Sequence, residues 1–350
     1  MKSKTIILAL SAGLALASCA PKASDTTKIS GEFAKDAPAE VTVSIPGKED
    51  IKVAVVDGKF SVDVPAEVAS LSVITAENGM KQRFISDGTA LVFTIDSLGQ
   101  ATVTSKTPKV SIQVRNQEYR DAQDAISDKY RSLIDSLGQD KLDSLYNEYE
   151  AEMKDLNLVY FEANKDNFIS SAALSQMLFD FAPAELDSLI STLDSAVRSN
   201  DIVTRIQKAV TAQLETAEGK MFTDFEVNGV KFSSYVGNGK YMLVDFWASW
   251  CGPCKAEIPN VKKVWEKYAG KDFDVLSVAV WDEKQASIDT AAAYGVKWNQ
   301  IVDAQSLPTE IYGIQGIPHI ILFGPDGTIL KRDLREEKIE AEVAKYVSAK

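Results

Sequence analysis

The chain has 350 residues, of which 45% are hydrophobic and 25% are charged, a composition typical of a globular protein with two or three domains. Its net charge of -12 at pH 7, without any Lys/Arg-rich block, excludes a nucleic-acid-binding surface, because a phosphate backbone requires a basic face. We therefore expect no nucleic-acid partner and a solvated acidic surface.

Residues 1–18 have the composition of a signal peptide. Two lysines precede an apolar run over residues 6–17, which is shorter than the roughly 20 residues that span a bilayer. The run ends in Leu-Ala-Ser-Cys, which resembles a bacterial lipobox with Cys19 as the lipidated residue. We expect residues 19–27 to be a lipidated tether that anchors the protein in the cell envelope, on the periplasmic side or at the outer membrane. The alternative is ordinary cleavage nearby, without lipid.

Residues 28–114 are predicted to form a small antiparallel β-domain. Short runs rich in Val, Ile and Phe show period-2 stretches and are separated by Pro-Gly, Asp-Gly and Asn-Gly turns. The clearest hairpin is expected at Asp57-Gly58, because this pair tolerates the positive φ angles of a primed turn.

Residues 115–218 are predicted to form an α-helical region, because apolar residues there recur at spacings of three and four. A helix over residues 168–179 should be capped by Asp166-Asn167, and another helix should cover residues 183–197. We interpret the apolar stripes as packing faces and not as a ligand site.

Residues 219–350 alternate strands and helices, which favours an α/β sheet with helices on its faces. A hairpin with its turn at Asn228-Gly229 is followed by a nearly continuous apolar run over residues 241–247, as expected for a buried central strand. Further strands are predicted at residues 273–281, 317–323 and 328–331, and a helix at residues 336–349.

Cys251 and Cys254 are the two thiols that remain once Cys19 carries lipid. They would close a loop too small to stabilise the fold much as a disulfide. Cys251 falls where the strand ends and a helix begins, since Gly252 allows a tight turn and Pro253 suits a first helical turn. There the helix dipole favours the thiolate. We therefore expect Cys251 to be an exposed attacking nucleophile, and Cys254 the more buried resolving thiol.

The segment VDFWASWCGPCKAEIP resembles the thioredoxin family, and in particular its extracytoplasmic TlpA-like branch. The resemblance covers roughly residues 219–350. Residues 250–254 have the form of the family's active-site motif, and Pro259 matches the proline that kinks the active-site helix. The earlier half of the chain resembles, less specifically, the β-domain and helical region of Bacteroidetes-type lipoproteins. The resemblance implies an α/β thioredoxin fold that performs disulfide exchange.

The same resemblance implies a role for Asp245, which stands where thioredoxins carry a buried acid. Desolvation in an apolar strand should raise the pKa of this carboxyl group, so that it could relay the proton of Cys254. The alternative is an acid that is satisfied by local hydrogen bonds and takes no part in catalysis.

Further residues are expected to contact the substrate. Ile317-Pro318 fits the family's cis-proline, which presents backbone edges to an extended substrate, although a simple tight turn is the alternative. His319 is the only histidine of the chain, and a structural role is the alternative to substrate contact. The full predicted substrate-binding set is Trp250, Gly252, Pro253, Ile317, Pro318 and His319.

Other side chains near the motif are expected to be structural or solvated. Trp247 should lie in the core, whereas Lys255 and Glu257 should face solvent on the first turns of the helix. A zinc site fails on ligand count, and a c-type haem would need a histidine where Lys255 stands. We therefore expect neither a metal nor a cofactor.

The Gly-Pro dipeptide between the cysteines is typical of reducing members of the family. We predict a protein-disulfide reductase that acts on disulfide-bearing exported proteins and is kept reduced by a membrane electron donor. Two alternatives remain open. One is a thiol peroxidase of the peroxiredoxin type, although residues 247–251 lack the threonine of the peroxidatic loop. The other is a ligand-binding lipoprotein with an accessory redox domain.

Overall fold

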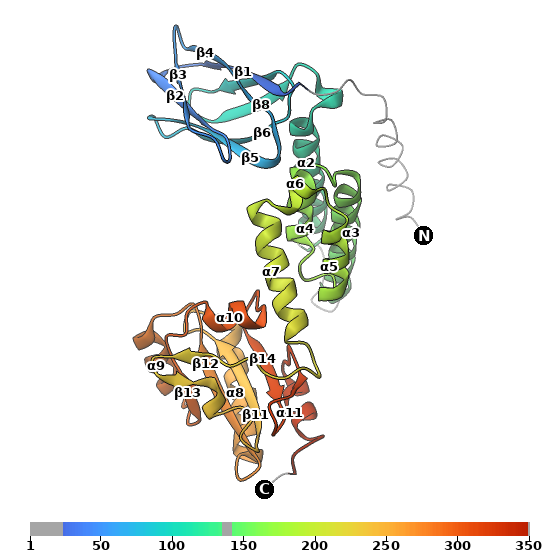
Figure 1. The fold of residues 1–350 in the computed structure, drawn as a ribbon, viewed down its shortest axis with the longest axis vertical. Helices are drawn as coiled ribbons and strands as arrows, with labels where there is room; N and C mark the ends of the chain where they lie inside the picture. The colour runs from blue at the N-terminus through green and yellow to red at the C-terminus, as the bar shows by residue number, and fades with distance from the viewer. Residues whose placement is uncertain (1–23, 135–141, 349–350) are drawn as a thin grey trace. The chain divides into compact units, whose positions relative to one another are not determined.

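The computed structural model describes residues 24–134 and 142–348, and Figure 1 shows their elements in chain order. The predicted signal peptide and the predicted lipidation of Cys19 lie outside the described residues. The chain forms two compact units, one reaching to Ala182 and including residues 188–204, the other made of residues 183–187 and 205–350. None of the described helices is long and apolar enough to cross a membrane.

The first unit begins with two four-stranded sheets, whose strand orders are β4-β1-β7-β8 and β3-β2-β5-β6. Alternate residues of each sheet point inward and form one core, which includes Val43, Phe84 and Phe93. All strand pairs are antiparallel except β1 with β7, which run parallel. The strands are β1 Thr26–Phe33, β2 Glu40–Ser44, β3 Ile51–Ala54, β4 Lys59–Pro65, β5 Glu67–Ala76, β6 Lys81–Ser86, β7 Leu91–Ile95 and β8 Ala101–Ser105.

The hairpin predicted at Asp57-Gly58 is present. Asp57 has φ 51° and Gly58 has φ 74°, and Val56 and Lys59 exchange two backbone hydrogen bonds of 2.9 Å. These are the features of a two-residue primed turn. The turn joins β3 of one sheet to β4 of the other, so the hairpin also connects the two layers.

The helical region starts at Ile112, close to residue 115, where the sequence predicts it. Asn167 caps α4 as expected, since its side chain accepts a hydrogen bond from the Ile169 amide. The helix predicted over residues 183–197 is instead two helices, because Asp194 caps a new one through the Ala196 amide. The helices are α2 Ile112–Ile134, α3 Leu142–Ala163, α4 Phe168–Gln176, α5 Pro183–Ser191, α6 Ser195–Arg198 and α7 Asp201–Glu215.

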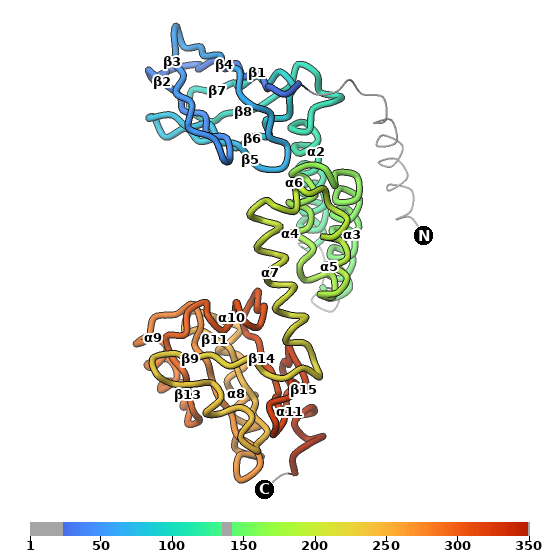
Figure 2. Tube along the Cα trace, in the orientation of Figure 1, coloured from blue at the N-terminus to red at the C-terminus, as the bar shows by residue number. Residues whose placement is uncertain are grey.

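The second unit is built on a five-stranded sheet with the order β13-β12-β11-β14-β15. The central strand β11 runs parallel to β12 and antiparallel to β14, and the chain can be followed through this unit in Figure 2. The sheet strands are β11 Tyr241–Trp247, β12 Phe273–Ala279, β13 Asn299–Ile301, β14 His319–Phe323 and β15 Ile329–Lys331. The helices of this unit are α8 Gly252–Tyr268, α9 Lys284–Ala293, α10 Leu307–Tyr312 and α11 Glu337–Val343.

Both faces of β11 are buried, as its apolar run predicts. Leu243 and Trp247 pack in one core cluster with residues of α8 and α11, whereas Val244 and Phe246 pack in another that includes Tyr312 of α10. Because side chains alternate along a strand, Asp245 lies on the α8 face of the sheet.

The predicted turn at Asn228-Gly229 is confirmed, between β9 Glu226–Val227 and β10 Val230–Lys231, with φ angles of 52° and 81°. The short strand β13 was not predicted. The mixed sheet with helices on its faces confirms the thioredoxin fold that the sequence indicates for the C-terminal part of the chain.

Candidate active site

Cys251 and Cys254 form a disulfide with an S–S distance of 2.02 Å at the start of α8. Cys251 is the N-cap residue of the helix, and the amide of Cys254 donates a hydrogen bond of 3.1 Å to its Sγ atom. Gly252 and Pro253 form the first helical positions between them and are both exposed. The sulfur of Cys251 therefore lies at the positive end of the helix, among its unpaired amides.

Both cysteines are buried in this disulfide form. Cys251 is 3% exposed and Cys254 is 0% exposed. Cys254 is the more buried residue, but Cys251 is not the openly exposed nucleophile that the sequence predicts, because neighbouring side chains surround the bond.

The Ile317–Pro318 peptide bond is cis, as expected. The Sγ atom of Cys251 lies 3.7 Å from the carbonyl oxygen of Ile317. Pro318 is buried, Ile317 is half-buried, and Gly316 before them is exposed. This segment therefore places backbone groups beside the disulfide, where an extended chain could reach them.

The two tryptophans of the motif differ in exposure as the sequence predicts. Trp247 is 1% exposed in the core, whereas Trp250 is 60% exposed. The Trp250 indole is held in place, because its Nε1–H donates a 2.8 Å hydrogen bond to the carbonyl of Trp281. Trp281 has φ 53°, a conformation that non-glycine residues rarely adopt. The next residue, Asp282, accepts hydrogen bonds from both the amide and the hydroxyl of Ser249.

Asp245 is buried at 1% exposure on the α8 side of β11. Burial raises the pKa of its carboxyl group to about 7, the negative charge of Glu257 adds to the rise, and the positive charge of Arg335 opposes it. The Oδ1 atom of Asp245 has no hydrogen-bond partner in the protein. This is the raised pKa that the sequence predicts, and Asp245 is therefore poised to bind or release a proton near neutral pH.

Glu257 is not on a solvated face, which corrects the prediction for this residue. It is 6% exposed on the inner side of α8, and its carboxylate accepts hydrogen bonds from Asn260 and from the backbone amide of Glu336. The spacing along α8 could have indicated this, because Cys254, Glu257 and Ile258 share one helical face. Lys255 is half-buried.

His319 is positioned by two charged side chains. Its Nδ1 atom lies 3.5 Å from Asp333 and its Nε2 atom lies 3.4 Å from Arg332. Burial lowers the pKa of His319 below its ordinary value, Arg332 and Arg335 lower it further, and Asp333 opposes them. The imidazole is therefore neutral at pH 7, and its Nε2 atom accepts a hydrogen bond from Arg332 while Nδ1 carries the ring proton.

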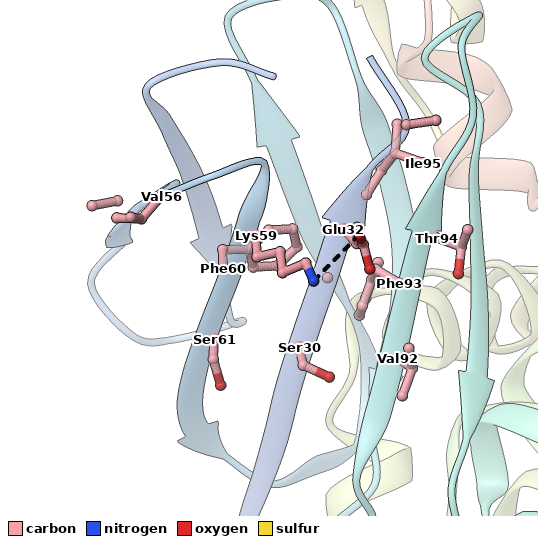
Figure 3. A pocket seen from close by; sticks show the side chains of 13 residues that line it. Ser30, Glu32, Val56, Lys59, Phe60, Ser61, Val92, Phe93, Thr94 and Ile95 are labelled. Carbon is pink, nitrogen blue, oxygen red and sulfur yellow. Dashed lines mark ion pairs between the residues drawn. The ribbon is translucent and has the colours of Figure 1, made fainter. Parts of the chain in front are cut away.

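The described residues contain no group of three or more His, Cys, Asp or Glu side chains arranged to hold a metal ion. A hollow of about 810 Å³ lies on the first unit, over strands β1, β4 and β7 (Figure 3). Its lining includes Ser30, Ser61 and Val92, together with Lys59 and Glu32, which lie 3.4 Å apart. The two cysteines among the described residues, Cys251 and Cys254, both lie in the second unit.

The fold and the site together define a class of protein: a thioredoxin-fold domain that carries a Cys-Gly-Pro-Cys disulfide beside a cis-proline. The model of the AhpC/TSA family matches residues 207–332 of the chain. Among curated proteins, the chain is similar to the thiol-disulfide oxidoreductase ResA of Bacillus subtilis, with 27% identity over 117 residues. This match covers 33% of this chain and 65% of the length of that relative.

Two solved structures are also similar to the C-terminal part of the chain. The thioredoxin domain of a thiol-disulfide oxidoreductase from Bacteroides vulgatus is 28% identical, and the match covers 38% of this chain and 97% of that one at a TM-score of 0.33. A thiol:disulfide interchange protein from Bacteroides sp. is 29% identical, with coverages of 38% and 91% and a TM-score of 0.34. The fold assignment rests on the sheet topology and the family match.

Proposed function

We propose that this protein is a thiol-disulfide oxidoreductase that works as a reductase of disulfides in exported proteins. The enzyme class is supported by its relatives, which are named thiol-disulfide oxidoreductases. The observation that carries the proposal is the Cys251–Cys254 disulfide at the N-terminus of α8, next to the carbonyl of Ile317. The direction of the reaction rests on the Gly-Pro dipeptide between the cysteines.

The reaction starts from the reduced protein. The thiolate of Cys251 attacks one sulfur of the substrate disulfide, which forms a mixed disulfide and releases the first substrate thiolate. The thiolate of Cys254 then attacks the sulfur of Cys251, which closes the Cys251–Cys254 bond and releases the second substrate thiolate. Two electrons pass from the enzyme dithiol to the substrate, and the two protons of the enzyme thiols end on the substrate thiols.

Asp245 acts in this scheme as the proton acceptor for Cys254. Cys254 is fully buried, so its thiol cannot lose a proton directly to bulk water. Asp245 has a raised pKa of about 7 and a buried Oδ1 atom without a protein partner, which suits a group that takes up and releases a proton at each turnover.

Trp250, Gly252, Pro253 and the segment Ile317–His319 form the substrate-binding surface in this proposal. Trp250, Gly252 and Pro253 are exposed around the disulfide, and Ile317 and His319 are half-buried beside it. An extended substrate segment would lie against the backbone of Ile317 while its disulfide faces Cys251. His319 is neutral and held by Asp333 and Arg332, so we assign it an orienting role and no proton transfer.

The cellular setting of the proposal is the envelope, with Cys19 lipidated and a membrane dithiol donor that renews the reduced form. This rests on the signal-like composition of residues 1–18 and on the lipobox resemblance. We propose the following domain limits: the β-domain covers residues 28–114, the helical region covers residues 115–218, and the redox domain covers residues 219–350.

The experiment compares disulfide reduction by the full-length chain with that of three variants. The reduced protein should release thiols from insulin, Cys251→Ser should abolish this activity, and Cys19→Ser should retain it. Cys254→Ser should accumulate as a mixed disulfide with the substrate. A chain that consumes hydrogen peroxide rapidly and leaves insulin intact would instead be the thiol peroxidase.

A second candidate function is ligand binding by the first unit, which the hollow of about 810 Å³ favours. A partner bound there would leave the redox domain as an accessory. If a chain lacking residues 28–114 reduced proteins extracted from the envelope as fast as the full-length chain, the β-domain would have no part in substrate selection.

A further inference from the structure

The loop of residues 333–336, which lies between β15 and α11, contains two non-glycine residues with positive φ angles. Asp333 has φ 55°, and Glu336 has φ 51° with ψ -134°. L-residues rarely adopt such values, and they persist where the surrounding structure fixes them. We refer to these four residues as the Asp333–Glu336 loop.

Two contacts join the Asp333–Glu336 loop to the redox site. The Nη2 atom of Arg335 donates a hydrogen bond to the carbonyl oxygen of Pro318. The backbone amide of Glu336 lies 3.2 Å from each carboxylate oxygen of the buried Glu257. The loop thus contacts the segment that borders the disulfide and the active-site helix α8 at the same time.

The Arg335 side chain is itself fixed by its neighbours. Asp333 Oδ1 lies 2.8 Å from Nη2, and Nη1 donates a 2.8 Å hydrogen bond to the carbonyl of Leu334. Leu334 is 4% exposed and its amide donates to the carbonyl of Ile320 in β14, which anchors the loop on the sheet. The guanidinium group is therefore held by several contacts at once, through Nη2 to Pro318 and Asp333 and through Nη1 to Leu334.

The charge of Arg335 also bears on the buried acids. The charged groups that act on Asp245 are Glu257 from α8 and Arg335 from the Asp333–Glu336 loop. Burial and Glu257 disfavour the ionised form of Asp245, and Arg335 favours it. Arg335 therefore opposes two effects that would otherwise keep Asp245 protonated at higher pH.

We propose that Arg335 is a positioning residue of the redox site, which fixes the Pro318 carbonyl and supplies a positive charge that acts on the buried Asp245. This inference rests on the proposed disulfide-exchange function for its effect on turnover. Its electrostatic part does not, because the charge acts on Asp245 in the oxidised protein as well. Arginine suits both tasks, since one planar group can hydrogen-bond a carbonyl and a carboxylate together.

The test is an NMR titration of the Asp245 carboxyl carbon in the oxidised full-length protein. Arg335→Gln removes the charge and should raise the Asp245 midpoint by about half a unit to one unit, the order expected for the loss of one nearby charge. Arg335→Lys keeps the charge and should leave the midpoint near that of the unmodified protein. Lys338→Gln removes an exposed charge three residues further on and should not shift it.

The reduced variants then report on turnover. Both Arg335→Gln and Arg335→Lys lose the paired contacts to Pro318 and Asp333, so both should raise the KM for a disulfide substrate, by about threefold or more. Only Arg335→Gln should also move the acidic limb of the pH–rate profile upward, by the same amount as the NMR midpoint. Lys338→Gln should change neither quantity.

An unchanged Asp245 midpoint in Arg335→Gln would overturn the proposal, and so would equal midpoints in the Gln and Lys variants. An unchanged KM in both variants would overturn its positioning part. If the unmodified protein reduced no disulfide, the proposed function would fail, while the NMR comparison would still decide whether the charge acts on Asp245.

Discussion

The backbone amide of Cys254 points at the sulfur of Cys251, with a distance of 3.1 Å from N to Sγ. This contact is the N-cap hydrogen bond of α8, with a sulfur in place of the usual oxygen. We expect the same amide to donate toward the Cys251 sulfur in the reduced protein, where a charged acceptor gains more from such a bond than a neutral one. The start of the helix therefore stabilises the thiolate specifically.

We expect Cys251 of the reduced protein to titrate below the ordinary cysteine value of about 8.5. The measurement is the rate of iodoacetamide alkylation between pH 5 and 10, in Cys254→Ala so that one thiol of the pair reacts. The same variant denatured in urea is the control, because unfolding removes the helix amides. Equal alkylation midpoints in the folded and unfolded states would contradict the thiolate assignment.

Replacing Asp245 by Asn should stabilise the oxidised protein at alkaline pH. The folded pKa of about 7 lies above the unfolded value of 3.8, so the folded state binds the proton more tightly. Ionisation therefore costs no stability below about pH 4, an increasing amount between about pH 4 and 7, and a constant amount above that. The gain in Asp245→Asn is at most about 4 kcal/mol at pH 8, reduced by the burial of an amide without partners.

The measurement is urea unfolding of the oxidised protein at pH 4 and at pH 8. Asp272→Asn, an exposed change just before β12, serves as the control and should leave the difference between the two pH values unaltered. A gain for Asp245→Asn that is equal at the two pH values would show that ionisation of this carboxyl does not limit stability.

Local signals in the sequence were enough to predict an α/β sheet in the redox domain and a strand-to-helix junction at Cys251, whereas the thioredoxin fold itself was implied by the resemblance of residues 219–350 to that family. The continuous apolar run of β11 and the Gly-Pro dipeptide after it determine where the strand ends and the helix begins. Both signals depend on only a few neighbouring residues. The two-residue turns at Asp57-Gly58 and Asn228-Gly229 likewise require positive φ angles, and this requirement can be predicted from the dipeptide alone.

The Asp333–Glu336 loop was not predicted as part of the site, because its contacts span long distances in sequence. Arg335 and Pro318 are separated by 17 residues, and Glu336 and Glu257 by 79. Glu257 looked like an ordinary surface acid, since a helix exposes most of its charged residues. Its spacing from Cys254 places it on the buried face of α8, but the Glu336 amide that it accepts from is a partner that the sequence does not reveal.

Trp250 is predicted to contribute to substrate binding, because it is a 60% exposed tryptophan with its indole fixed by the Trp281 carbonyl. Trp250→Ala should raise the KM for a protein disulfide by about 5- to 30-fold, which corresponds to about 1–2 kcal/mol, with a smaller effect on kcat. Trp250→Phe keeps an aromatic ring and should recover part of the loss. Tyr294→Ala, at another exposed aromatic residue, is the control. A kcat loss at unchanged KM would place Trp250 in the chemical step instead.

Gly31 and Phe60 test the packing of the β-domain. A methyl group at Gly31 would lie 2.1 Å from the Phe60 ring, which is 4% exposed in the core between the sheets. Gly31→Ala should therefore destabilise the first unit by about 1–3 kcal/mol, because the ring has to move within a packed core. The exposed change Glu32→Ala, on the same strand, should have little effect.

In Gly31→Ala combined with Phe60→Leu, the smaller side chain makes room for the methyl group, so the loss of unfolding free energy should be smaller than the sum of the two single losses. Additive losses in this double-mutant cycle would mean that the two residues do not compete for the same space.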